Sequence, residues 1–250
     1  MSAAPERAPR LHFAESLEAR ASIALGRDQA HYLSAVLRRG TGDHVRLFNG
    51  RDGEWLCRLT GAGKRGATAV CEEKLAEPTP LPDLDYLFAP LKAARLDFIA
   101  QKATEMGARR LRPVITARTV VSRLKIERLR ANAVEAAEQC NLVAVPEVLA
   151  EEPLDRVLDA WEDGRRLIFC DEAGDGRGPL EVLEGIAPGP LGVLIGPEGG
   201  FTPEERHRLV GLPFVTAVSL GPRIMRADTA AVAILALVQA TLGDWGRFQG

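Results

Sequence analysis

Two glycine-containing turns, at residues 194–205 and 219–231, hold the residues whose types and spacing are best suited to chemistry. Each turn lies between an apolar run and a sequence typical of a helix. In α/β proteins such turns lie at the carboxyl ends of strands, where ligands bind. Glycine lets a backbone bend sharply and approach a ligand closely. We therefore expect both turns to surround one ligand, the alternative being two ordinary strand exits.

The residues around the turns predict helix starts and exclude two common ligand classes. Thr202 and Glu205 have the spacing of a capping box, with Pro203 at the first helical position. A second helix is expected to begin near Asp228. Neither turn has the Gly-Lys-Ser/Thr of a triphosphate loop or the G-x-G-x-x-G of a dinucleotide site.

The elements that would position these turns divide the chain into two predicted domains, residues 1–77 and 78–250. The first has strand-like segments separated by Gly-rich turns and one helix, which we expect from Asp28 to about Arg38 with Asp28 as its cap. Several short strands in so few residues predict a small β-barrel. Three prolines within residues 77–83 predict the linker. The expected strands of this domain are 45–49, 54–60 and 67–73.

Strands and helices alternate in the second predicted domain, which is typical of an α/β fold with a mainly parallel sheet. The expected strands are 86–89, 111–116, 167–171, 192–195 and 216–220, and the expected helices are 92–106, 123–139, 203–211 and 228–243, with a Gly-rich loop at 174–178.

The composition of the 250-residue chain, with 46% hydrophobic residues, allows a substantial core. The longest apolar run, Ala230–Val238, is too short to span a bilayer, and residues 1–12 lack the apolar stretch of a signal peptide. The 4 cysteines include no C-x-x-C pair, and the 4 histidines form no ligand-spaced cluster. These features predict a cytoplasmic protein without a metal site.

Charge is strongly segregated, although the net charge is only −2. Eleven basic and three acidic residues lie between Lys92 and Arg130, whereas four basic and seventeen acidic residues lie between Glu135 and Glu205. A local basic face is what phosphate binding requires, although such charge runs are also found on solvated helix faces. The residues we expect to bind the phosphates of such a polyanion, a nucleic acid, are Arg38, Arg39, Lys64, Arg65, Arg95, Lys102 and Arg118.

The motifs LIGPEGGFTPEE and LGPRIMRADTAA resemble the two C-terminal signatures of the bacterial 16S rRNA uracil-N3 methyltransferases, members of the SPOUT superfamily of knotted enzymes. The segments HYLSAVLRR, LFNGRDGEW, QKATEMGARRLRPVITARTVV and AAEQC resemble earlier parts of the same family, in the same order. The resemblance implies a trefoil-knotted sheet, a PUA-like N-terminal barrel and a homodimer that acts on 16S rRNA of the small ribosomal subunit.

Three positions depart from the family pattern. Met225 replaces the usual Leu or Ile, and Asp228 replaces the more frequent Glu. Asn141 and Leu142 occupy a turn where the family commonly carries an Arg, which puts one phosphate or dimer contact in doubt.

The resemblance also implies S-adenosyl-L-methionine as the cofactor, so that no metal is needed. Ile195, Leu220 and Ile224 could enclose an adenine while backbone groups of both turns bind its edges. The expected cofactor-binding residues are Leu194, Ile195, Gly196, Pro197, Glu198, Gly199, Gly200, Ser219, Leu220, Gly221, Ile224, Met225, Arg226, Thr229 and Ala230.

Arg226 and Glu198 are the expected catalytic residues. Uracil N3 must lose a proton before it attacks a methyl group, and a guanidinium could stabilise the anion that forms. Arg226 could instead clamp a phosphate or pair with Asp228 or Glu198. Glu198 could act as a base or orient the substrate, and its alternative is an acidic residue that favours a helix N-terminus.

Other functions remain open on the sequence alone. They are a SPOUT methyltransferase for another RNA position, in tRNA or at a ribose 2′-hydroxyl, and a non-catalytic RNA-binding or ribosome-assembly factor. The last helix is apolar on nearly every face, so we expect it to be buried either in a homodimer or within one chain.

Overall fold

The computed structural model describes residues 7–63, 66–120, 124–172 and 177–247. The chain forms two compact units. Unit 1 comprises Met1–Pro80 together with Ala137–Val145, and unit 2 comprises Leu81–Ala136 and Pro146–Gly250. A boundary after residue 77 remains our prediction, and nothing in the sequence pattern assigned 137–145 to the first unit.

Unit 1 is built on a five-stranded sheet with the order β1-β3-β4-β5-β2. Neighbouring strands are antiparallel except β1 and β3. Alternate residues of the strands, such as Val45 and Leu47, are buried in one core with Phe13 and Leu33. The bounds are β1 Arg10–His12, β2 Ser22–Leu25, β3 His44–Phe48, β4 Glu54–Gly63 and β5 Gly66–Ala76.

The helical segment of unit 1 differs from the expectation at both ends. Helix α1 covers only Arg27–His31, and a π-helical segment, Tyr32–Val36, follows it. The residue before the helix is Gly26, whose extended backbone places it at the cap, so our assignment of Asp28 as the cap is wrong. Asp28 lies in the first turn, where an acidic side chain favours the helix dipole. The helix stops before Arg38 because Arg38 has a left-handed φ of 55°.

Unit 2 contains a seven-stranded sheet with the order β12-β10-β11-β6-β7-β8, and β9 pairs with β7 at its edge. Every pairing in it is parallel, which confirms the predicted α/β class with a mainly parallel sheet. The bounds are β6 Leu84–Phe88, β7 Arg110–Ile115, β8 Glu147–Val148, β9 Glu152–Pro153, β10 Arg166–Cys170, β11 Leu191–Ile195 and β12 Val215–Val218.

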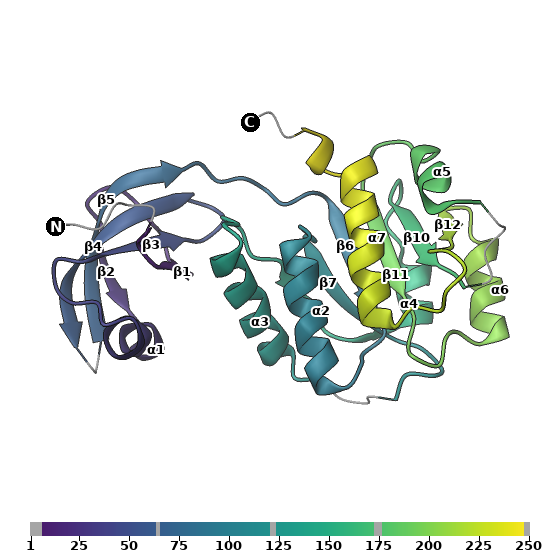
Figure 1. Cartoon of the computed structure of the whole chain (residues 1–250), viewed down its shortest axis with the longest axis horizontal. Coiled ribbons are helices and arrows are strands. Elements are labelled where there is room, and N and C mark those ends of the chain that lie inside the picture. Colours follow the sequence, from purple (N-terminus) through teal and green to yellow (C-terminus); the bar gives the residue numbers. More distant parts are fainter. Residues whose placement is uncertain (1–6, 64–65, 121–123, 173–176, 248–250) are drawn as a thin grey trace. The chain divides into compact units, whose positions relative to one another are not determined.

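Helices cover the sheet of unit 2, and Figure 1 shows α2 beside α7. Apolar residues of α4 and α6 share a buried cluster with Leu87, Phe169 and Leu194 from the sheet. The sequence pattern predicted α2, α3, α6 and α7 but not α4 or α5. The bounds are α2 Ala93–Glu105, α3 Ile126–Gln139, α4 Leu154–Asp159, α5 Pro179–Glu184, α6 Pro203–Gly211 and α7 Ala227–Thr241.

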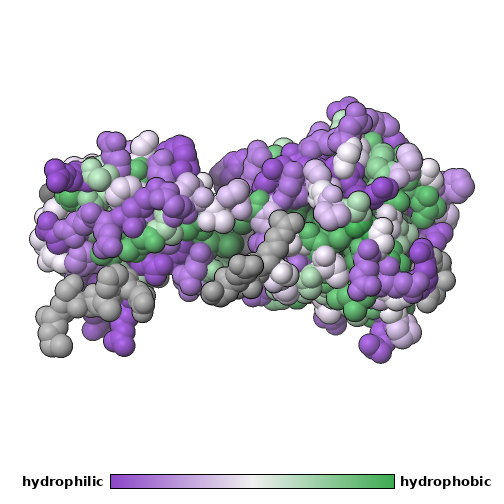
Figure 2. Space-filling view, turned by 90° about the horizontal axis from the view of Figure 1, so that it is seen from above, coloured by the Kyte–Doolittle hydropathy of each residue, from purple (hydrophilic) through white to green (hydrophobic). Residues whose placement is uncertain are grey.

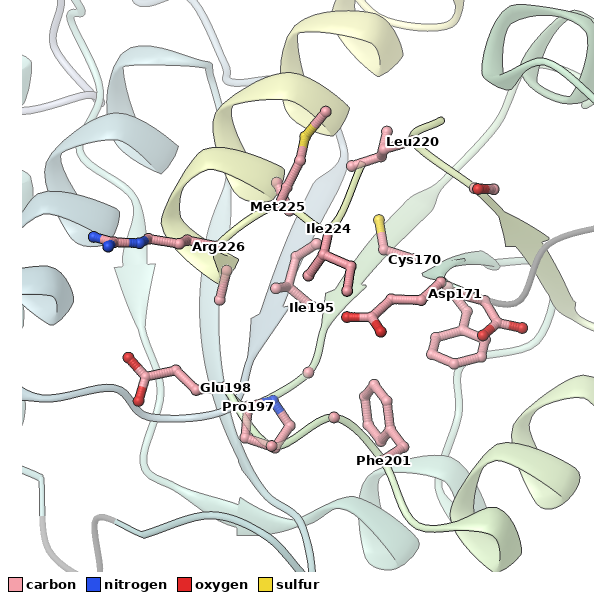
Figure 3. A pocket seen from close by; sticks show the side chains of 18 of the residues that line it. Cys170, Asp171, Ile195, Pro197, Glu198, Phe201, Leu220, Ile224, Met225 and Arg226 are labelled. Carbon is pink, nitrogen blue, oxygen red and sulfur yellow. The ribbon is translucent and has the colours of Figure 1, made fainter. Parts of the chain in front are cut away.

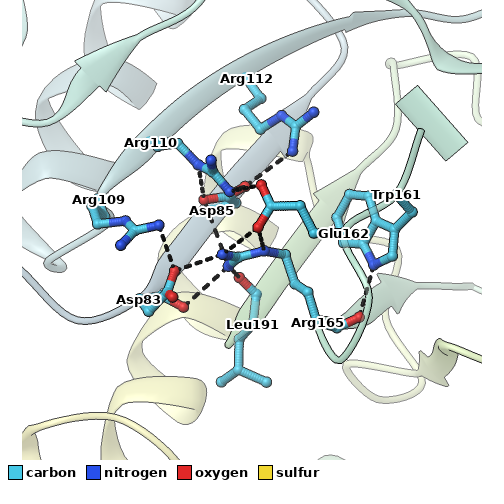
Figure 4. A network of polar contacts seen from close by, with 9 residues as sticks. All are labelled: Asp83, Asp85, Arg109, Arg110, Arg112, Trp161, Glu162, Arg165 and Leu191. Carbon is cyan, nitrogen blue, oxygen red and sulfur yellow. Dashed lines mark hydrogen bonds and ion pairs between the residues drawn. The ribbon is translucent and has the colours of Figure 1, made fainter. Parts of the chain in front are cut away.

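Three of the eleven basic residues between Lys92 and Arg130, namely Arg109, Arg110 and Arg112, lie instead in an ion network at the amino ends of the strands (Figure 4). Asp85 is buried and accepts two hydrogen bonds from Arg110, at 2.6 and 2.7 Å, and one from Arg112 at 3.1 Å. Arg165 is also buried and donates to Asp83 at 2.7 Å. A buried carboxylate needs such partners because its desolvation is costly.

Helix α7 is less buried than its apolar sequence suggests. Ala231, Ile234, Leu235 and Val238 are buried, whereas apolar residues on its other faces are only half-buried. Burial within one chain therefore does not account for every apolar face of this helix. Within the described residues, no helix is long and apolar enough to cross a membrane.

Candidate functional site

Unit 2 contains a cavity of 640 Å³ at the carboxyl ends of β10, β11 and β12, opposite the ion network (Figure 3). Both glycine turns line it, as expected from their positions after parallel strands. The lining also includes the end of β10, from Phe169 to Glu172. A volume of this size falls within the range of small-molecule sites.

The first turn joins β11 to α6 and is fixed by the predicted capping box. The Thr202 hydroxyl accepts from the Glu205 amide at 3.2 Å, and the Thr202 amide donates to the Glu205 carboxylate at 2.9 Å. Gly200 has a φ of 68°, which favours glycine. At Gly196 a Cβ atom would stand 2.5 Å from the Phe201 ring, so glycine is required for packing there.

The second turn joins β12 to α7. Gly221 has a φ of 105°, a conformation that side chains with a Cβ rarely adopt. Ile224 follows on the same turn and is 87% exposed although it lines the cavity. Helix α7 begins immediately afterwards, with Arg226 as its N-cap and Asp228 in its first turn, close to the predicted start.

The cavity brings together most of the residues predicted to bind a cofactor. Leu194 and Thr229 do not line it, and Leu194 belongs to the core on the α4 and α6 face. The predicted residues that do line it are Ile195, Gly196, Pro197, Glu198, Gly199, Gly200, Ser219, Leu220, Gly221, Ile224, Met225, Arg226 and Ala230.

Several lining residues escaped the sequence analysis. Phe201 packs edge-to-face on Phe169, with their ring centroids 5.1 Å apart, and forms an apolar wall. Arg206, from α6, pairs with Asp171 at 2.8 Å. The sequence did contain a signal for Arg206. It directly follows Glu205, the last residue of the predicted capping box, so it had to lie in the first part of a helix that begins at the first glycine turn.

Four charged side chains gather where the two turns meet α2. Arg95 forms an ion pair with Glu198, and its Nε lies 3.8 Å from the Asp228 carboxylate. Arg226 is exposed, and in Figure 3 its side chain extends away from Cys170 and Phe201. The two predicted catalytic residues therefore lie on the rim of the cavity, and Glu198 is held by a residue that we expected to bind RNA.

Cys170 lies at the end of β10 in the lining of the cavity. Burial raises the pKa of its thiol to about 12. The thiol is therefore protonated at physiological pH and forms a neutral, polarisable part of the cavity wall. It is not a nucleophile, because the thiolate is the reactive form.

Besides Arg95, the residues predicted to bind RNA fall into three groups. Arg118 lines the cavity and donates to the Gly199 carbonyl at 2.7 Å, while Lys102 pairs within α2 with Glu105 at 2.7 Å. Arg38 and Arg39 belong to unit 1. Lys64 and Arg65 lie outside the described residues. In the described part of the chain, no group of three or more His, Cys, Asp or Glu side chains is arranged to hold a metal ion.

Comparisons with known proteins agree with this geometry. Residues 77–239 match the model of an RNA methyltransferase domain, and residues 25–71 match an RNA methyltransferase PUA domain. The ribosomal RNA small subunit methyltransferase E of Bacillus subtilis is 30% identical over 237 residues, which cover 90% of this chain and 92% of that protein. The protein of the same name from Rickettsia conorii is 29% identical over 232 residues, 92% of this chain and 94% of its own length.

Solved structures show the same fold. The methyltransferase E of Neisseria gonorrhoeae bound to S-adenosyl methionine has a TM-score of 0.83 and 27% identity, and the match covers 96% of this chain and 100% of that chain. A putative methyltransferase from Legionella pneumophila, in complex with the same cofactor, has a TM-score of 0.81 and 25% identity, covering 94% and 98%. Because the RNA methyltransferase domain model matches more than half of this chain, the chain belongs to the RNA methyltransferase family that includes the ribosomal RNA small subunit methyltransferases E.

Proposed function

We propose that this protein transfers a methyl group from S-adenosyl-L-methionine to N3 of one uridine in 16S ribosomal RNA of the small subunit. The observation that carries the proposal is the convergence of both glycine turns on one cavity in a member of this family. The relative from Neisseria gonorrhoeae, whose crystal structure contains bound S-adenosyl methionine, supports the choice of ligand.

The residues present fit this cofactor. The cavity has apolar walls from Ile195, Leu220 and Phe201, and its two turns offer backbone groups rather than bulky side chains. A Cβ atom at Gly200 or Gly221 would have no neighbour within 4 Å, so the cavity is open above both glycines. S-adenosyl-L-methionine, when bound, supplies a methyl group already activated on a sulfonium.

The chain must then stabilise the uracil anion and orient the base. Arg226 lies on the cavity rim at the N-terminus of α7, where its guanidinium and the helix dipole both favour negative charge. It would donate to a uracil carbonyl oxygen and so stabilise the N3 anion as the proton leaves. Glu198 is engaged by Arg95, which supports a role in orienting the substrate more than a role as base.

The finer features of the fold and assembly also belong to this proposal. Family membership supports a trefoil knot in unit 2, closure of the unit 1 sheet into a PUA-like barrel and a cytoplasmic site of action on the ribosomal subunit. The half-buried faces of α7 support a homodimer, because Val232, Ala236 and Leu237 would otherwise stay partly in water. Figure 2 shows apolar surface among the polar residues of unit 2, where Leu180 and Trp245 are among the exposed large side chains.

The test is direct. Purified protein is incubated with isotopically labelled S-adenosyl-L-methionine and small ribosomal subunits from a strain that lacks the gene. One portion of the RNA is digested to nucleosides and another to oligonucleotides with a sequence-specific ribonuclease, and mass spectrometry of the two digests gives the identity and the position of the labelled nucleotide. We expect labelled 3-methyluridine at one position, and label in a ribose or in tRNA would point to another target. If the protein did not bind the cofactor at millimolar concentration, both methyltransferase functions would be excluded, and the non-catalytic ribosome-assembly factor would be the remaining function.

A further inference from the structure

The charged groups of the cofactor cavity lie on two sides of it. Glu198 and Arg226 lie on one rim. Figure 3 shows Asp171 on the other side of the cavity, with Ile195 between. Arg206 from α6 also lines the cavity, and it pairs with Asp171. The proposed methyl transfer uses neither Asp171 nor Arg206.

Asp171 holds the guanidinium of Arg206 through several hydrogen bonds. The Arg206 Nε lies 3.1 and 3.0 Å from the two carboxylate oxygens, and its Nη2 lies 2.8 Å from Oδ2. The Asp171 side chain is 7% exposed, whereas the Arg206 side chain is 43% exposed. The carboxylate is thus shielded by the protein, and part of the arginine side chain is open to a ligand.

The outer N–H groups of this guanidinium are not used by the protein. A guanidinium carries five N–H groups in one plane, and the Nη1 atom of Arg206 has no hydrogen-bond partner among the described residues. Two other arginines of the cavity are engaged: Arg95 pairs with Glu198, and Arg118 donates to a backbone carbonyl of the first turn at 2.7 Å. Arg206 therefore offers donors to a ligand of the cavity.

Both members of the pair are placed by regular elements. The Asp171 amide donates to the Val218 carbonyl at 3.0 Å, which continues the pairing of β10 with β12. The Arg206 amide donates to the Thr202 carbonyl at 2.9 Å in the first turn of α6. A guanidinium that is fixed in this way loses little conformational freedom when it binds a ligand.

The charges around Arg206 favour a zwitterion over a polyanion. Asp171 offsets the charge of Arg206, and Glu172, the next residue along the chain, lines the cavity as well. These two carboxylates would repel successive phosphates of an RNA strand. An amino acid suits such a site, because its carboxylate can bind the guanidinium while its ammonium group lies near an acidic side chain.

We propose that Arg206 binds the carboxylate at the amino-acid end of S-adenosyl-L-methionine, and that Asp171 is a positioning residue that holds Arg206. This carboxylate is the only anionic group of the cofactor. A planar guanidinium matches it, because two parallel N–H groups can bind the two carboxylate oxygens. The pair would thereby select the cofactor against nucleosides that lack an amino-acid end. The inference rests on the proposed function, since it takes this cofactor to be the ligand of the cavity.

The experiment compares two thioethers by isothermal titration calorimetry. S-adenosyl-L-homocysteine carries the amino-acid end, whereas 5′-methylthioadenosine lacks it. Arg206→Met should weaken binding of the first about tenfold, the scale of a lost hydrogen bond between charged groups, and change binding of the second by less than about twofold. Arg208→Met is the matched control, because Arg208 lies on the same helix and pairs with Asp155 and Asp159 outside the described lining of the cavity.

Two further variants keep the test independent of folding. Arg206→Met leaves the buried Asp171 short of a cationic partner, so the double variant Arg206→Met/Asp171→Asn removes both charges together. It should show the same selective loss. Asp171→Asn alone should also weaken binding of S-adenosyl-L-homocysteine and spare 5′-methylthioadenosine, because the guanidinium loses its fixed direction. Decarboxylated S-adenosylmethionine identifies the group that is bound, since Arg206→Met should not lower the affinity for this analogue.

Three outcomes would overturn the proposal. Equal losses for the two thioethers would mean that Arg206 shapes the cavity or contacts the adenosine. Unchanged affinities for both, in a variant that is folded, would mean that the ion pair serves folding alone. Unchanged cofactor affinity combined with weaker binding of small-subunit RNA would make Arg206 an RNA contact. Failure of the proposed function would appear differently, in the unaltered protein, as absence of cofactor binding or of methyl transfer.

Discussion

Arg95 and Glu198 form an ion pair that ties helix α2 to the first glycine turn of the cofactor cavity. The same guanidinium lies 3.8 Å from Asp228 in the first turn of α7, so one arginine connects both glycine turns. Both partners of the pair are partly exposed, with 35% and 47% of their side-chain surface in water. Such an exposed pair contributes little to the free energy of folding, so we expect its main effect to be on the relative positions of the two turns.

The first prediction concerns this connection. Arg95→Ala should weaken S-adenosyl-L-methionine binding several-fold because it releases Glu198, while the melting temperature changes little. Lys102→Ala is the matched control, since Lys102 lies on the same helix but contacts Glu105 and the Phe98 ring rather than either glycine turn among the described residues. Isothermal titration calorimetry on both variants measures the effect. Identical cofactor affinities would show that the ion pair does not position the turn.

The second prediction concerns catalysis. Arg226→Ala should lower kcat by about 100-fold, the scale of losing one group that stabilises an oxyanion, and change cofactor affinity much less. The reason is that its proposed partner is the uracil anion, which forms only as methyl transfer proceeds. Single-turnover rates at saturating RNA check the kcat effect. Normal single-turnover rates combined with weaker RNA binding would make Arg226 a phosphate clamp.

A third prediction separates two glycines of the cavity. Gly221→Ala should cost about 1–2 kcal/mol because φ at this position is 105°, and cofactor affinity should fall by roughly tenfold if the turn relaxes. Gly199→Ala should be tolerated, since its Cβ would stand 3.6 Å from Arg118 in ordinary contact. Thermal melts and cofactor titrations of the two proteins test this, and equal behaviour would show that the second turn adapts without strain.

The fourth prediction follows from the pKa of Cys170, which burial raises to about 12. A raised pKa keeps the thiol protonated throughout the neutral range, so alkylation by iodoacetamide should be slow at pH 7.5 and rise about tenfold per pH unit up to pH 10. N-acetylcysteine, alkylated in parallel, should level off at a lower pH, about one unit above the ordinary thiol pKa of about 8.5. Mass spectrometry of the Cys170 peptide gives the rate. A plateau of that rate near pH 9 would contradict the assignment.

The fifth prediction concerns the stability of unit 1. Arg10→Met removes a side chain that is 5% exposed and leaves Glu54, at 3% exposed, with one fewer cationic partner. Breaking a buried pair costs about 3–5 kcal/mol. Arg46→Met should cost much less, because Arg46 is more exposed and, among the described residues, it is Arg10 that binds the carbonyls of Ala137, Glu138 and Leu142. Hydrogen exchange of β3 and β4 under native conditions compares the two variants, and equal protection would show that Arg10 is dispensable.

The features of the fold that depend on residues close in sequence were predicted well. The capping box of Thr202 and Glu205, the strand before each turn and the helices α2, α6 and α7 all follow from spacing and composition within a few residues. The glycine turns were placed correctly on one cavity because parallel strands bring their carboxyl ends to the same edge of a sheet.

What the sequence could not predict depends on contacts between distant residues. The basic segment from Lys92 to Arg130 looked available for RNA, but Arg110 and Arg112 are neutralised by Asp85, which lies 25 or more residues away in sequence. The wall formed by Phe201 on Phe169 and the connection of Arg95 to Glu198 likewise need the folded chain. Short elements such as α4 lack a periodic pattern long enough to recognise.

The contribution of Ala137–Val145 to unit 1 has a consequence for the order of events during synthesis. Arg10 is made near the start of the chain, but the carbonyls that it binds belong to residues made much later. A translating ribosome must add the 65 residues between Pro80 and Val145, which takes about 3 to 13 seconds, before the N-terminal unit can close. During that interval the Arg10 guanidinium has Glu54, the Phe48 ring and water as partners but lacks the carbonyls that it binds in the folded unit, so the nascent N-terminal segment depends on the chain that follows it to finish folding.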